Sequence, residues 1–155
     1  MKFGDVLRKE RERKRLSVEA TATKLGLPVA AYEEMEGGAS QMEEWAPKLA
    51  EIAIKLSTPT SRLISETGKS AQAAQSDGQC GRLISKHRER RGMSQDELAG
   101  KLGWPVEHIV TIENGSSPLE QNGPLVLRFA EVIDQPVFNL FYPCGLPFGE
   151  LTDYP

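Results

Sequence analysis

Apolar residues between positions 94 and 115 recur at the spacing of two short amphipathic helices. Leu98, Ala99 and Leu102 fall on one face of a helix that begins after Ser94. Ile109 and Ile112 give the following helix a buried side. Each helix is therefore expected to bury one face and to leave the other free.

The ends of these two helices carry matching signals. Ser94 is a good N-cap, and Glu97 three residues later completes a capping box. Gly103 follows the first helix, where glycine adopts a positive φ without strain. Pro105 fits the opening of the second helix, and Gly115 follows its end. Two helices of about eight residues around such a turn form a helix-turn-helix.

The first half of the chain repeats the second. A shift of 77 positions places Gly4 on Gly81 and needs no gap afterwards. The identical pairs include Lys9 and Lys86, Arg11 and Arg88, Glu12 and Glu89, Arg13 and Arg90, Ser17 and Ser94, Ala22 and Ala99, Lys24 and Lys101, Leu25 and Leu102, Gly26 and Gly103, Pro28 and Pro105, Val29 and Val106, Glu36 and Glu113, and Gly38 and Gly115. Chance does not produce this density, so the sequence predicts a tandem pair of one small domain.

The predicted fold class is all-α, with two tandem five-helix domains at residues 1–66 and 80–142. The helices are expected at 3–14, 18–25, 29–36, 46–56 and 59–65, and at 80–91, 95–102, 106–113, 124–133 and 136–141. Pro47 and Pro59 are placed in first turns, where proline is tolerated. Residues 67–79 are rich in Gly, Ser, Gln and Ala and predict a flexible linker, and residues 143–155 form an apolar, proline-rich tail.

Composition narrows the function classes. A net charge of −3 is unusual for a nucleic-acid binder and counts against strong non-specific affinity. The two cysteines and two histidines show no ligand spacing, so no metal and no cofactor are expected. No nucleophile–base arrangement is visible, and we predict that the protein is not an enzyme. The sequence shows no signal peptide and no apolar run of about 20 residues, so a cytoplasmic protein without a membrane segment is expected.

The order of residues resembles the lambda-repressor-like, or XRE, helix-turn-helix regulators. The residues that carry the resemblance are Arg88, Ser94, Gln95, Glu97, Leu98, Ala99, Leu102, Gly103, Ile109, Ile112, Glu113 and Gly115. The resemblance implies that the second motif helix enters the major groove of double-stranded DNA. This second motif helix is called the recognition helix. The resemblance also implies structural ion pairs between the first helix of each domain and the end of its recognition helix, namely Arg11 with Glu36 and Arg88 with Glu113.

By this resemblance, the second domain is expected to be the main DNA reader. Ser94 and Gln95 start the first motif helix, where Gln95 can bond a phosphate or a base edge, unless it is simply solvated. The outward residues of the recognition helix are expected to be Glu107, His108 and Thr111. Glutamate can accept from cytosine N4, threonine can touch a thymine methyl, and His108 can bond a phosphate or a purine.

The first domain has weaker chemistry at the same positions. Val18 replaces the glutamine, and the outward residues become Ala30, Ala31 and Glu34. Two alanines offer almost no base readout, and glutamates repel phosphate. The sequence predicts a degraded reader here, with a shape-reading partner of the second domain as the alternative.

Basic residues gather at the end of the first helix of each domain. The expected phosphate contacts are Arg13, Lys14, Arg15, Arg90 and Arg91. Because glutamates are interleaved with them, a solvated charged face is the alternative interpretation.

Together these features predict a sequence-specific DNA-binding transcriptional regulator. The alternative is a protein-interaction or assembly module, including an antitoxin-like regulator that binds a protein partner. A homodimer is expected through the C-terminal part, where residues 137–141 lead into Tyr142, Leu146 and Phe148. The tail could instead fold back on its own chain.

Overall fold

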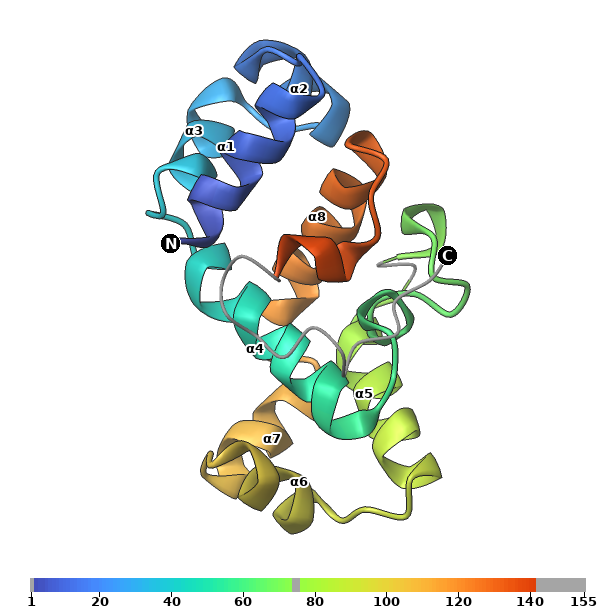
Figure 1. The fold of residues 1–155 in the computed structure, drawn as a ribbon. Coiled ribbons are helices and arrows are strands. Elements are labelled where there is room, and N and C mark those ends of the chain that lie inside the picture. Colours follow the sequence, from blue (N-terminus) through green and yellow to red (C-terminus); the bar gives the residue numbers. More distant parts are fainter. Residues whose placement is uncertain (1, 74–75, 142–155) are drawn as a thin grey trace.

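The computed structural model describes residues 2–73 and 76–141, and every regular element in this part of the chain is a helix (Figure 1). The elements are α1 (Phe3–Arg13), α2 (Val18–Leu25), α3 (Val29–Glu36), α4 (Met42–Leu56), η1 (Thr60–Leu63), η2 (Ser70–Gln72), α5 (Gln79–Arg90), α6 (Gln95–Leu102), α7 (Val106–Glu113), α8 (Leu119–Val132) and η3 (Val137–Leu140). The prediction of an all-α fold is confirmed. None of the helices in the described ranges is long and apolar enough to cross a membrane.

Two helices begin about one turn or more earlier than predicted. The expected placement of Pro47 in a first turn is wrong, because α4 starts at Met42 and contains Pro47 in its interior. Likewise α8 starts at Leu119 and contains Pro124. Met42 is 1% exposed and Leu119 is fully buried, so the burial of these side chains favours the additional turn despite the proline.

The first three helices of each half form a small unit of their own. In the first half α1 and α2 pack against α3, and in the second half α5 and α6 pack against α7. A glycine permits the closest approach in each unit: a Cβ atom on Gly4 or Gly81 would strike main-chain carbonyls at the end of α3 or α7. The two units lie at opposite ends of the molecule (Figure 1).

The start of each unit is held by a glutamate from the fourth helix of the same half. The carboxylate of Glu43 accepts from the N–H groups of Phe3 at 2.7 Å and Gly4 at 3.1 Å. Glu120 accepts in the same way from Cys80 at 3.2 Å and Gly81 at 3.0 Å. These N–H groups have no partner inside their helices, so each glutamate satisfies two of them.

The fourth helices then cross between the halves. α4 packs against α1 but also against α6 and α8, and α8 packs against α5 but also against α2. Tyr32 of α3 stacks on Phe129 of α8, with 6.5 Å between the ring centroids. The buried apolar side chains therefore form one core that extends through both halves.

Candidate nucleic-acid interface

The turn between α6 and α7 is fixed by contacts within the motif. Ser94 Oγ accepts from the N–H of Glu97 at 3.0 Å, and Glu97 Oε1 accepts from the N–H of Ser94 at 3.1 Å. Gly103 ends α6 in the left-handed conformation, with φ of 74°. Leu98, Ile109 and Ile112 are fully buried beneath the motif. The local sequence thus sets the angle at which α7 leaves the turn.

An ion pair ties α5 to the end of α7. Arg88 Nε lies 2.7 Å from Glu113 Oε2, Arg88 Nη2 donates to Oε1 at 3.0 Å, and the two side chains are 11% and 6% exposed. Hydrogen bonding to Glu113 raises the pKa of Arg88. Gln95 Nε2 also donates to Glu113 Oε1, at 3.1 Å. The amide nitrogen of Gln95 is therefore held inside the motif.

The first half contains the corresponding pair. Arg11 Nε lies 2.6 Å from Glu36 Oε2, and Arg11 Nη2 donates to Glu36 Oε1 at 3.2 Å. Removing one partner of such a nearly buried pair leaves an uncompensated charge, which makes both pairs structural elements of their units.

The outward face of α7 carries Glu107, Val110 and Thr111, all of which are exposed. Thr111 Oγ1 donates to the main-chain oxygen of Glu107 at 3.0 Å, so its hydroxyl is used within the helix. Val110 is 41% exposed and, with Val29, is one of the two large hydrophobic side chains that are exposed in the described ranges. The outward residues expected from the sequence do not include Val110, although its spacing of three residues from Glu107 places both on one helical face.

His108 does not lie on this outward face. Its ring stacks on Trp45 of α4 at 5.3 Å between centroids and meets the Trp104 ring edge-on at 5.2 Å. His108 Nε2 lies 3.2 Å from Lys48 Nζ, and that ammonium group also lies 4.4 Å from the centre of the Trp45 ring. His108 therefore packs α7, the expected recognition helix, against α4 from the other half of the chain.

This contact predicts a pH-dependent stability. Lys48 Nζ can only donate, so His108 Nε2 must accept and the ring must be neutral. Burial, and then the Lys48 charge, lower the pKa of His108, while Glu44 opposes them. A lowered folded-state pKa means that the stabilisation is present above the unfolded value of about 6.5 and is lost as pH falls below it.

The free energy of unfolding of the parent protein should fall between pH 8 and pH 5. We expect this fall to be smaller in His108→Phe. Urea titrations at each pH measure the difference. His87→Gln should also show a smaller fall, because burial lowers the pKa of His87 as well. A pH dependence that is unchanged in His108→Phe would contradict the prediction.

The basic residues differ in how they are used. Arg13, Lys14, Arg15 and Arg90 are exposed at the ends of α1 and α5, and Arg13 lies 3.2 Å from Glu10. The Arg91 guanidinium is bound across the halves instead. Its Nε donates to the carbonyl of Leu56 and its Nη2 to that of Ser57, both at 2.8 Å, and so caps α4.

The outward face of α3 is apolar and acidic. Val29 is 38% exposed, and Ala30, Glu33 and Glu34 are exposed beside it, whereas Ala31 is half-buried. This face offers carboxylates and small apolar groups, but no basic side chain.

The last short helix belongs to the core. Val137, Leu140 and Phe141 are buried, and Phe141 stacks on Phe3 of α1 at 5.4 Å between ring centroids. Tyr142, Leu146 and Phe148, on which the dimer expectation depends, lie outside the described residues. Within the described ranges, no group of three or more histidine, cysteine or acidic side chains is placed to hold a metal ion.

Residues 79–136 match the family model of a helix-turn-helix domain. The match begins with α5 and includes α6, α7 and α8. Comparison with curated proteins and with solved structures finds no match. The second half of the chain is therefore similar to helix-turn-helix domains, a type that generally binds DNA in regulatory proteins.

Proposed function

We propose that the protein is a sequence-specific transcriptional regulator of the XRE type, which acts in the cytoplasm on double-stranded DNA through α7. The observation that carries the proposal is the exposed face of α7. Glu107 offers an acceptor for cytosine N4, and Val110 and Thr111 offer apolar carbon to thymine methyl groups. The helix-turn-helix match over residues 79–136 supports the same conclusion.

We further propose that the chain is a tandem duplication, with domains at 1–66 and 80–142, a linker at 67–79 and a tail at 143–155. Contacts that recur in both halves support this proposal. The Arg88–Glu113 pair recurs as Arg11–Glu36, and the contacts that Glu120 makes recur at Glu43. Through Ser70, the linker also binds Glu131 of α8.

In this proposal the first domain is a degraded reader. Its recognition-helix position, α3, presents Glu33 and Glu34, which repel phosphate, beside Val29 and Ala30. With a net charge of −3 for the whole chain, affinity for DNA must come from local basic groups. Arg90 and the Arg13–Arg15 segment are the exposed candidates.

Arg90 and Arg91 should have separable effects. Because Arg90 is exposed, Arg90→Ala should weaken all DNA alike and reduce the slope of log K against log salt by about 0.9. Because Arg91 binds the carbonyls of Leu56 and Ser57, Arg91→Ala should mainly lower the free energy of unfolding, by about 1–3 kcal/mol. Fluorescence anisotropy across a salt series and urea unfolding measure the two quantities. A salt slope that is unchanged in Arg90→Ala would place this side chain off the DNA.

The alternative function is a protein-interaction module, including an antitoxin-like regulator with a protein partner. The acidic, apolar face of α3 favours it, since basic protein surfaces complement such a face. A gel-shift experiment with genomic fragments at low and high salt separates the two functions. Retarded, sequence-dependent complexes support the DNA reader, and no retardation at low salt supports the alternative.

We also propose a homodimer. If the first domain is a degraded reader, a single chain has only one domain that reads DNA strongly. Sedimentation equilibrium at tens of micromolar tests this on the full chain and on a chain that ends at Tyr142. The full chain is expected to dimerise and the shortened chain to be monomeric. A monomeric full chain would refute the dimer, and a dimer that survives the truncation would move the interface away from the tail.

A further inference from the structure

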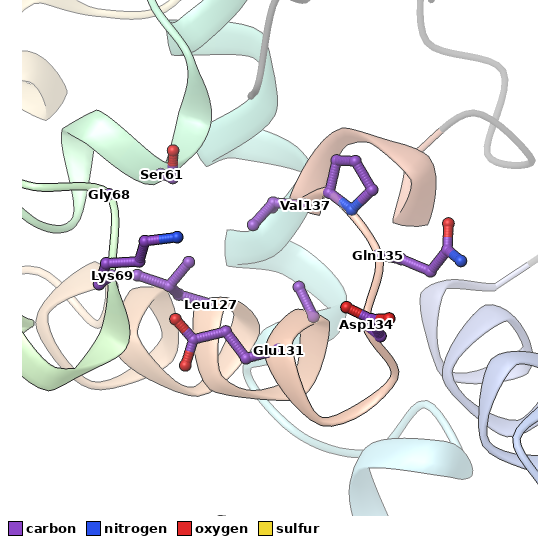
Figure 2. Close-up of a pocket in the computed structure, with 10 residues that line it drawn as sticks. Ser61, Gly68, Lys69, Leu127, Glu131, Asp134, Gln135 and Val137 are labelled. Atoms are coloured by element: carbon purple, nitrogen blue, oxygen red, sulfur yellow. The ribbon is translucent and has the colours of Figure 1, made fainter. Parts of the chain in front are cut away.

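A pocket of about 320 Å³ lies between α8, η3 and the segment that joins the two halves (Figure 2). Its floor is apolar and well packed: Leu127 and Val137 are 3% exposed and Ala130 is 2% exposed. The volume is at the lower end of the range for small-molecule sites, roughly 300–1,000 Å³. A ligand of about amino-acid size therefore suits it.

Charged groups of opposite sign stand around this floor. The Lys69 side chain extends over it from one side, and Asp134 lies on the other side in Figure 2. Glu131 stands between them and is already engaged, since its Oε2 accepts from the N–H of Ser70 at 2.9 Å and its Oε1 accepts from the Ser70 hydroxyl. Within the described part of the chain, the Lys69 ammonium and the Asp134 carboxylate have no hydrogen-bonding or ion-pair partner.

The first half of the chain lacks this charged rim. At the position of Glu131 it has Ile54, which is 8% exposed, and at the position of Asp134 it has Ser57. The carbonyl of Ser57 is occupied by Arg91. The acidic side of the rim is therefore a feature of the second half and not a by-product of a shared helical arrangement.

We propose that this pocket binds a small zwitterion with a short aliphatic body, of the amino-acid class. The ligand carboxylate pairs with Lys69, its ammonium group pairs with Asp134, and its carbon chain covers Leu127 and Val137. A plain acid or a plain amine fills the same volume but leaves one of the facing charges unmatched. The site is distinct from the face of α7 and does not depend on DNA binding.

The test is a titration of the ¹⁵N-labelled full chain followed by NMR, with four six-carbon probes. Norleucine and 6-aminohexanoate carry both charges at different separations, whereas hexanoate and hexylamine each carry one. We expect at least one zwitterion to shift the amides of Gly68 and Ala130 saturably, with a Kd on the order of 1 mM or tighter. The singly charged probes should bind about fivefold to tenfold more weakly.

Variants then assign the charges. Lys69→Gln and Asp134→Asn should each weaken the zwitterion about fivefold to tenfold, and Lys101→Gln, an exposed change on α6, should not. Asparagine is chosen because residue 134 has φ of 56°, which asparagine tolerates. No saturable shift from either zwitterion would overturn the proposal. Equal binding of hexanoate or hexylamine, or unchanged binding in both pocket variants, would also overturn it. The probe series uses the unaltered protein, so its result does not depend on whether a variant folds.

Discussion

Replacing Phe129 with alanine is expected to lower the free energy of unfolding by about 3–4 kcal/mol, within the range for truncating a buried phenylalanine. Phe129 is fully buried on α8, and its ring stacks on Tyr32 of α3. Because this contact joins the second half to the first, the loss should loosen both. We expect amide exchange to accelerate in α2 and α3 as well as in α5 to α8.

Urea unfolding measures the free energy, and hydrogen exchange followed by mass spectrometry locates the change. Arg128→Ala is the matched control, since the neighbouring side chain is exposed and its loss should cost less than about 0.5 kcal/mol. Faster exchange confined to α5–α8 would show that the crossing of α8 does not couple the halves in solution.

The second large effect concerns DNA affinity. Replacing Glu107, Val110 and Thr111 together by alanine should weaken binding to a selected site by about 10²–10³-fold, because the polar contact of Glu107 contributes roughly 1–3 kcal/mol of discrimination and each apolar contact with a thymine methyl group contributes ~0.8 kcal/mol. Affinity for unrelated DNA should hardly change, since these side chains carry no positive charge. A selection from random DNA, followed by anisotropy measurements on the selected and an unrelated duplex, supplies both numbers.

The matched control acts on the equivalent positions of α3. Glu33→Ala with Glu34→Ala should leave the site preference unchanged and strengthen binding to all DNA slightly, because two carboxylates are removed. A comparable loss of specificity in this control would mean that both halves read DNA, against the degraded-reader proposal.

Thymine methyl groups provide a chemical test of Val110. Replacing a contacted thymine by uracil removes one methyl group, and should weaken binding about fourfold, from ~0.8 kcal/mol per buried apolar carbon. Val110→Ala should show the same loss on the thymine site and no further loss on the uracil site. Additive losses would place Val110 away from the methyl group.

The sequence alone determined the parts of the fold that local contacts control. The predicted bounds of α2, α3, α6 and α7 agree with the structure, because the caps at Ser17 and Ser94 and the left-handed glycines at Gly26 and Gly103 act within a few residues. These signals need no knowledge of the rest of the chain. The all-helical class follows from the same short-range preferences.

Only the tertiary structure decided where the fourth helices pack. Both α4 and α8 present an apolar face. Because the hydrophobic effect is non-directional, the apolar face of either helix could have packed against either half. The same burial moved the start of α4 back to Met42, against the local signal of Pro47. His108 faces α4 instead of the outward side because Trp45 and Lys48, far away in sequence, lie against it. Arg91 is held by α4 for the same reason: its partners are main-chain carbonyls that only the crossing of the helices brings within hydrogen-bonding distance.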